Sequence, residues 1–257
     1  MKKTDANDAI GIAIASTQLG MTCWQVKALS QQNIQAIQIS RKWFDRTITS
    51  LGNHIRALCF EYGAIITLGK KSLGQAITHF ISPESTDLLE QIKPLLMILW
   101  QQYQTTEEHY KAITLQLQQW VTQSEPCKRL MKLEGVSHIG AAGLLAYLGD
   151  GQGVKNGRDA AVFVGVTLKQ HGSGGKVVMI GIDKHCGDKY LRSILYQVAL
   201  SVISRLPVEV KTYKQPWLIN LVRRVGIKRA CVALINKTVR TAWALLNYRT
   251  EYTNQII

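Results

Sequence analysis

Residues 34–58 read IQAIQISRKWFDRTITSLGNHIRAL, and this stretch determines the architecture that we expect for the chain. Apolar residues recur in it at alternating intervals of three and four, which is the heptad spacing of a helix with one buried stripe. The stripe consists of Ile34, Ile37, Arg41, Phe44, Ile48, Leu51, Ile55 and Leu58, and Arg41 is its one polar member. We therefore predict a single long helix that ends at Gly63.

A second heptad stripe lies between residues 89 and 120 and consists of Leu89, Ile92, Leu96, Leu99, Tyr103, Thr106, Tyr110, Ile113, Leu117 and Trp120. The intervening residues 64–83 are expected to form a loop with one short helix. Two long helices joined in this way predict an antiparallel helical hairpin or coiled coil over residues 28–125, paired with another subunit in a dimer or tetramer. We expect the aromatic residues of this stripe to pack there rather than to stack on bases.

Composition indicates a folded protein and favours neither a membrane span nor a disulfide framework. Of the 257 residues, 46% are hydrophobic and 19% are charged, and no run of eighteen apolar residues occurs. The first fifteen residues carry acids where a signal peptide needs an unbroken apolar core. The five cysteines are scattered and form no CxxC pair, as expected of reduced thiols in a cytosol.

The positive charge is concentrated in the second half of the chain. The whole chain carries a net charge of +14, from 31 basic and 17 acidic residues. From Lys128 onward there are 20 basic and 7 acidic residues, a net charge of +13, whereas the preceding residues contribute only +1. This asymmetry predicts a polyanion-binding domain, residues 126–257, attached to a nearly neutral one.

The stretch LEGVSHIGAAGLLAYLGD, residues 133–150, has the pattern of a helix-hairpin-helix. Gly135 and Gly140 would keep the turn tight, so that backbone N–H groups and the start of the next helix could approach a phosphate. An ordinary helical turn with glycines at its ends is the alternative. The local positive charge favours contact with nucleic acid.

Residues 162–182 predict two short strands around the turn GSGG, and helices are expected near 188–205, 216–224 and 227–247. The last two helices carry the basic pairs Arg223, Arg224, Lys228 and Arg229. Taken alone, Ser173 in the glycine-rich turn is most simply a turn residue. The exposed position between glycines would nevertheless let a phosphodiester approach its hydroxyl.

The chain begins MKKTDANDA, which predicts a helix over residues 4–19 with Thr4 or Asp5 as its N-cap. Asp5 and Asp8 lie one turn apart on the same helical face, where a pair of carboxylates can supply one side of a metal site. The alternative is that two acids in a first turn simply stabilise the helix dipole.

Five segments together resemble transposases of the IS110 family, particularly its IS1111 branch, and the related Piv-type DNA invertases. They are KTDANDA, LEGVSHIGAAGLLAYLGD, HGSGGK, GDKYLRSILYQVA and KRACVALINKTVRTAWALL, and they occur in the order of that family. The resemblance implies an RNase H-like (RuvC-like) domain with four metal-binding acids, Asp-Glu-Asp-Asp. A coiled coil and a C-terminal transposase domain with a serine nucleophile would follow. The expected fold class is thus mostly α, with a small β-hairpin.

The resemblance assigns roles to particular residues. Asp5 and Asp8 match the third and fourth acids and would bind Mg²⁺, and Ser173 matches the catalytic serine. The resemblance and the charge pattern together predict nucleic-acid contacts from Gly135, Gly140, Lys169, Lys176, Arg192, Arg223, Arg224, Lys228 and Arg229. The implied partners are DNA and a structured guide RNA from the element itself, in the cytoplasm at a bacterial nucleoid.

The first two acids of the family lie upstream of the motif with which this chain starts. We therefore expect residues 1–27 to be the C-terminal remnant of the RNase H-like domain, in an N-terminally shortened protein that is inactive alone. One alternative is a DNA- or RNA-binding protein without catalytic activity, and another is a non-functional gene remnant. A coding segment for the missing acids directly upstream of Met1 would favour the transposase.

Overall fold

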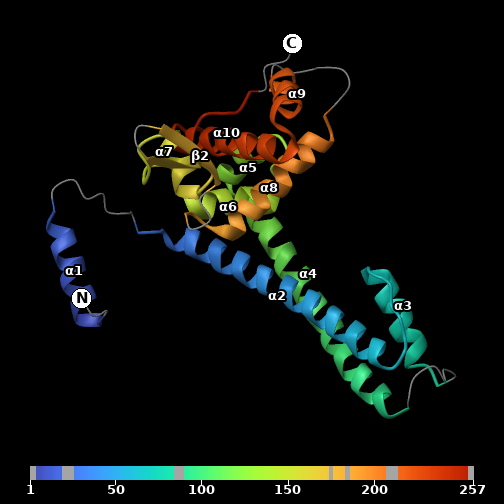
Figure 1. Ribbon diagram of the computed structural model, residues 1–257. Coiled ribbons are helices and arrows are strands. Elements are labelled where there is room, and N and C mark those ends of the chain that lie inside the picture. Colours follow the sequence, from blue (N-terminus) through green and yellow to red (C-terminus); the bar gives the residue numbers. More distant parts are fainter. Residues whose placement is uncertain are drawn as a thin grey trace.

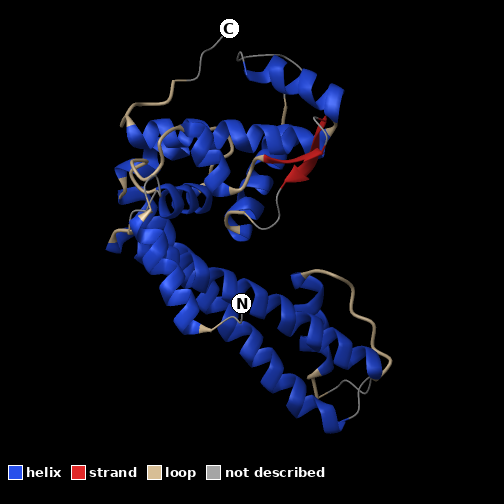
Figure 2. Ribbon diagram, turned by 60° about the vertical axis from the view of Figure 1, so that its left-hand side comes forward, coloured by secondary structure: helices blue, strands red, loops and turns tan. Residues whose placement is uncertain are grey.

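The computed structural model describes residues 4–18, 26–83, 90–173, 176–182, 186–206 and 214–253. Its described part is mostly helical, as predicted, with one two-stranded antiparallel sheet (Figures 1 and 2). Two long helices form an arm that extends from a cluster of shorter helices near the C-terminus (Figure 1). None of the helices in the described ranges is both long and apolar enough to cross a bilayer.

Helix α1, Asp5–Thr17, begins as the sequence predicts, with Thr4 as its N-cap. The Thr4 hydroxyl accepts a hydrogen bond from the Asn7 backbone N–H at 3.4 Å. No residue of α1 is buried, and its isoleucines Ile10, Ile12 and Ile14 are all more than half exposed. In Figure 1 the helix stands apart from the rest of the protein. The RNase H-like origin of residues 1–27 therefore stays a prediction.

The arm consists of α2, Leu29–Glu61, and α4, Lys93–Gln123, which run side by side in opposite directions (Figures 1 and 2). The two predicted stripes face each other: Ile34, Ile55, Leu96, Tyr103 and Leu117 are all buried. Ile48 and Leu51 also pack against apolar residues of the arm. Each stripe is thus covered by the other within one chain, so the stripes alone do not require a second subunit.

Arg41, the polar member of the first stripe, is held by three side chains. Its guanidinium donates to the Thr114 hydroxyl at 3.1 Å, to the Tyr190 hydroxyl at 3.3 Å and to the Tyr110 hydroxyl. The guanidinium carbon also lies 4.8 Å from the centre of the Tyr110 ring. Because Tyr190 belongs to a different part of the protein, Arg41 joins the base of the arm to the C-terminal helices.

The connector between the long helices contains α3, Lys70–Phe80, and a short 3₁₀ turn, Glu90–Ile92. The apolar side of α3, with Leu73, Ile77 and Phe80, closes a small core at the far end of the arm. This helix is the short one that the sequence predicts between residues 64 and 83.

The C-terminal unit, residues 125–253, surrounds a larger core. It contains α5, Glu125–Met131; α6, His138–Leu148; α7, Gly157–Val164; β1, Leu168–Ser173; β2, Lys176–Ile182; α8, Lys189–Ser204; α9, Lys214–Val225; and α10, Ile227–Asn247. Eight of the eleven residues of α6 are buried, because α2, α4, α5 and α8 all pack around it. The Trp243 indole of α10 donates to the carbonyls of Gly151 and Val154, which fixes the loop before α7.

Candidate catalytic hairpin and nucleic-acid interface

The candidate serine lies at the tip of the β-hairpin. β1 and β2 pair antiparallel, and Ser173, the last residue of β1, stands directly opposite Lys176, the first residue of β2. Lys169 pairs with Ile180 near the base of the hairpin, next to a register irregularity at Leu168. The backbone therefore brings Ser173 and Lys176 together and sets Lys169 four residues further down the strand.

The same register identifies His171 as a residue that sequence reasoning missed. It lies two positions before Ser173 in β1 and pairs with Val178 of β2. The HGSGGK motif already contained this signal, because histidine is the side chain that most often serves as a general base.

Two backbone segments cross at the base of the hairpin, and each has a glycine at the crossing. Gly165 ends α7 with φ 77°, and Gly187, with φ 66°, precedes the Asp188 N-cap of α8. A Cβ atom on Gly187 would lie 2.1 Å from the Val164 carbonyl oxygen, and one on Gly165 would lie 2.3 Å from the Cys186 carbonyl oxygen. Only glycine fits both the left-handed backbone and this close approach. The crossing thus fixes where the hairpin leaves the helical core.

The Arg192 side chain forms hydrogen bonds to both segments of this crossing. Its guanidinium donates to the carbonyl oxygens of Gly165, at 3.2 Å, and Cys186. On the other side, the Asn236 amide of α10 donates to the Val166 carbonyl at 3.2 Å. The sequence predicts a nucleic-acid contact for Arg192. The structure shows this side chain bonded to the base of the hairpin, and its contact with nucleic acid stays a prediction.

The two glycines of the predicted helix-hairpin-helix also serve packing. Gly135, with φ 77°, lies against α8, where an added Cβ would come within 2.5 Å of the Val202 side chain. Gly140 is buried, with the Val136 and Val198 side chains beside it. A substituent at either position would therefore meet protein before it met a phosphate. A backbone contact between this turn and DNA stays a prediction.

Four exposed basic residues surround the turn between the last two helices. Arg223 and Arg224 lie in the last turn of α9, and Lys228 and Arg229 lie in the first turn of α10, on either side of Gly226. We refer to these four residues as the basic corner. Cations at the start of a helix oppose its dipole, so Lys228 and Arg229 favour an anion there.

The candidate metal ligands Asp5 and Asp8 are exposed in the first turn of α1. Among the described residues, no group of three or more His, Cys, Asp or Glu side chains could hold an ion. The two carboxylates thus fit a metal site only with further donors from outside the described residues. The structure does not bring Asp5 or Asp8 together with the hairpin.

These features define a helical protein with a serine-bearing hairpin and a cluster of exposed basic residues, which is the character of a DNA-processing protein. The chain belongs to the IS110 family of insertion-sequence transposases. Residues 127–215 match the model of the "Transposase IS116/IS110/IS902 family", a range that begins in α5 and includes the whole hairpin and α8.

Curated relatives support this assignment over nearly the whole chain. The chain is 33% identical to the transposase for insertion sequence element IS1111A of Coxiella burnetii, over 97% of this chain and 68% of that protein. It is 32% identical to a probable family 20 transposase of Pseudomonas aeruginosa, over 97% of this chain and 74% of the relative. The transposase for insertion sequence element IS1328 of Yersinia enterocolitica is 28% identical, over 98% of this chain and 74% of its own length.

Proposed function

We propose that this chain cuts and rejoins DNA as part of an insertion-sequence transposase, with Ser173 as the nucleophile. The proposal rests on the position of Ser173 at the tip of the β-hairpin. Hydrogen bonds from Arg192 and Asn236 hold the base of this hairpin, and the whole hairpin lies within the range that matches the family model. A nucleophile must be exposed to reach a phosphodiester and yet held in a constant position.

In the proposed step the Ser173 Oγ attacks phosphorus and its proton passes to a base, for which His171, two residues earlier in β1, is the candidate. The bond from phosphorus to the departing deoxyribose oxygen breaks, and that oxygen takes up a proton. Attack by a second DNA hydroxyl reverses the step and releases serine. The ester conserves the phosphodiester energy, so rejoining needs no external energy source.

Lys176 and Lys169 are proposed to balance the negative charge that grows on the phosphate oxygens. Lys176 is better placed for this role, because it pairs with Ser173 across the hairpin. Asp5 and Asp8 are proposed to contribute to Mg²⁺ binding, which would supply Lewis-acid activation of the phosphate. Since the described residues provide only these two carboxylates at that place, completion of the site requires other donors.

The basic corner is proposed to bind the DNA backbone, and a structured RNA of the element is the proposed guide.

We also propose that the arm mediates self-association, although its two stripes already cover each other within one chain. Apolar side chains on its outer surface support this, since Trp43 is 60% exposed and Ile98 is 65% exposed.

A second candidate function is that of a basic protein that only binds nucleic acid. The separation of α1 from the hairpin favours this candidate (Figure 1).

The test compares wild type and Ser173→Ala, each expressed from the intact insertion sequence so that any other product of the element is present. Wild type should give recombination and an adduct with DNA that survives detergent. Ser173→Ala should lose both and keep its affinity for DNA. Recombination by Ser173→Ala would refute the proposed nucleophile, and DNA binding without recombination by wild type would favour the second candidate.

A further inference from the structure

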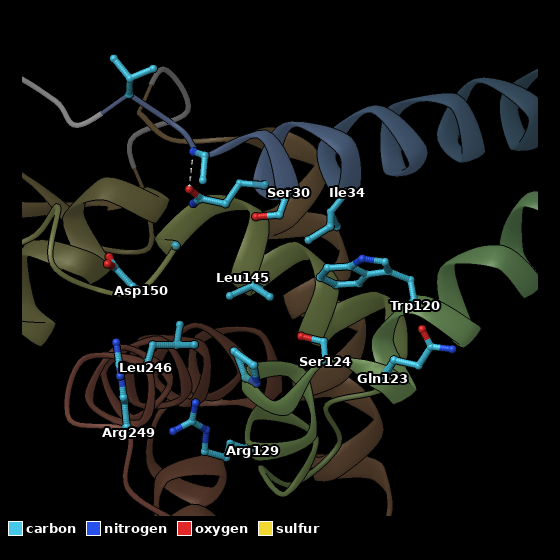
Figure 3. Close-up of a pocket in the computed structure, with 15 residues that line it drawn as sticks. Ser30, Ile34, Trp120, Gln123, Ser124, Arg129, Leu145, Asp150, Leu246 and Arg249 are labelled. Atoms are coloured by element: carbon cyan, nitrogen blue, oxygen red, sulfur yellow. Dashed lines mark hydrogen bonds between the residues drawn. The ribbon is translucent and has the colours of Figure 1, made fainter.

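A pocket of about 640 Å³ lies where the base of the arm meets the C-terminal unit (Figure 3). It is formed by the first turns of α2, the end of α4, the start of α5 and the end of α10. Ser30 and Ile34 line one side, and Figure 3 shows Arg129 and Arg249 along the opposite edge. Neither the family match nor the proposed catalytic step assigns this pocket a role.

Arg129 supplies the first indication of a ligand. Its Nε is buried, and within the described residues it has no hydrogen-bond acceptor. Buried donors in folded proteins are almost always paired, so the unpaired Nε leaves this guanidinium short of one acceptor. The Arg129 side chain lines the pocket, and a guanidinium there is well suited to the oxygens of a phosphate.

A second arginine, Arg249, lines the same pocket. Its backbone has φ 52°, and it is the one non-glycine residue with positive φ in the described part of the chain. This conformation is a common ending for a helix, and Arg249 directly follows Tyr248, the C-cap of α10. The exposed Arg249 side chain stands at the edge of the same pocket as Arg129.

Trp120 also lines the pocket, whereas its place in the heptad stripe predicts only a packing role. Its half-buried indole contacts the core but also forms one wall of the pocket, with Asp150 across from it (Figure 3). An indole face stacks on any base, and a carboxylate accepts hydrogen bonds from base amino groups. The remaining polar lining includes the Ser30 and Ser124 hydroxyls.

We propose that this pocket binds one unpaired nucleotide of the nucleic acid on which the protein acts. The base stacks on Trp120, and the phosphate lies between Arg129 and Arg249. The volume suits a nucleotide, and two arginines against one carboxylate favour an anion. The strand then leaves across α5, where Lys128 and, at the helix end, Lys132 are exposed and pair with Glu125 and Glu251 in the absence of nucleic acid. This inference rests on the proposed function, because it deepens the mode of nucleic-acid binding.

The key variant is Arg249→Gly, because glycine removes the guanidinium and also relieves the left-handed backbone. If the Arg249 side chain had no role in binding, the variant would bind normally and be at least as stable as wild type. The proposal predicts unchanged or higher thermal stability together with about tenfold weaker binding of a single strand. Arg129→Met should weaken that binding similarly.

The probe is a short single-stranded oligonucleotide, prepared as DNA and as RNA, with one 5-iodouracil for photocrosslinking. A blunt duplex of the same sequence serves as the reference ligand. Lys228→Met, in the basic corner, is the matched control because it removes one cation away from the pocket. It should weaken duplex binding, which the pocket variants should leave unchanged. Comparing the DNA and RNA probes identifies which nucleic acid supplies the nucleotide.

A crosslink at Trp120, with selective loss of single-strand binding in Arg249→Gly, would establish the site. Duplex binding by wild type, with no crosslink at Trp120 and no effect of Arg249→Gly on the single strand, would refute the pocket assignment alone. Failure of wild type to bind either ligand would instead refute the proposed function.

Discussion

Gly187 at the base of the serine hairpin provides a sharp test of how this chain holds its candidate nucleophile. The change is Gly187→Ala, which adds one carbon atom at a position with φ 66°. The added Cβ would lie 2.1 Å from the Val164 carbonyl oxygen and 2.7 Å from the Gly165 backbone nitrogen. Both contacts are with backbone, so no side chain can turn aside, and the two crossing segments must separate.

The expected cost has two parts. A left-handed conformation costs a non-glycine residue about 1–2 kcal/mol. Forcing an extra carbon into a tightly packed place costs roughly 1–3 kcal/mol more. Gly187→Ala should therefore lower the free energy of unfolding by about 3 kcal/mol in total.

Gly63→Ala is the matched control, because Gly63 has φ 82° but no atom within 4 Å of a Cβ there. It should cost only the backbone part, about 1 kcal/mol. Urea unfolding measures both values. A Gly187→Ala variant no less stable than Gly63→Ala would refute the tight crossing, and with it the argument that the crossing fixes the hairpin.

Three further predictions concern the arm, a buried thiol and the basic corner. Arg41→Met should destabilise the protein by about 1–3 kcal/mol in urea unfolding, because the Tyr110 and Tyr190 hydroxyls lose a charged partner. Burial raises the pKa of the Cys127 thiol to about 11. The unfolded thiol ionises near its usual pKa of 9, so stability should fall between about pH 9 and pH 11, and Cys127→Ala should reduce that fall. Arg223→Ala should lower the slope of log affinity against log salt by about one for duplex DNA.

Each of these predictions has a contradicting result. A stability of Arg41→Met equal to that of wild type would show that the contact between arm and C-terminal unit contributes nothing. An unchanged alkaline profile in Cys127→Ala would exclude this thiol as the cause of the fall. An unchanged salt slope in Arg223→Ala would remove that residue from the set of phosphate contacts.

The order of the elements was predictable from the sequence because it depends on local patterns. Heptad spacing located α2 and α4, and the GSGG turn between two apolar stretches located the β-hairpin. Helix α7, Gly157–Val164, was not predicted, because the glycines and polar residues before it resemble a loop. Its start depends on the Asn156 side chain, which accepts hydrogen bonds from the backbone N–H groups of Arg158 and Asp159.

The site was less predictable, because its geometry depends on contacts between distant segments. The charge pattern cannot tell that Arg192 turns inward to the Gly165 and Cys186 carbonyls, whereas Arg223 stays exposed. The sequence cannot tell whether a glycine allows close approach of DNA or of another part of the protein. In the structure, Gly140 lies beside the side chains of Val136 and Val198. Trp120 follows the heptad and yet lines a pocket, because α5 and α10 leave space beside it.

The most direct test of the central claim is the identity of the residue that becomes linked to DNA. The protein, expressed from its intact insertion sequence, is incubated with Mg²⁺ and a nicked DNA substrate that prevents rejoining. The adduct is then digested and sequenced by mass spectrometry. We predict a nucleotide esterified to Ser173 in the peptide that contains HGSGGK. A nucleotide on any other residue, or recombination with no covalent adduct, would contradict the assignment of Ser173 as the nucleophile.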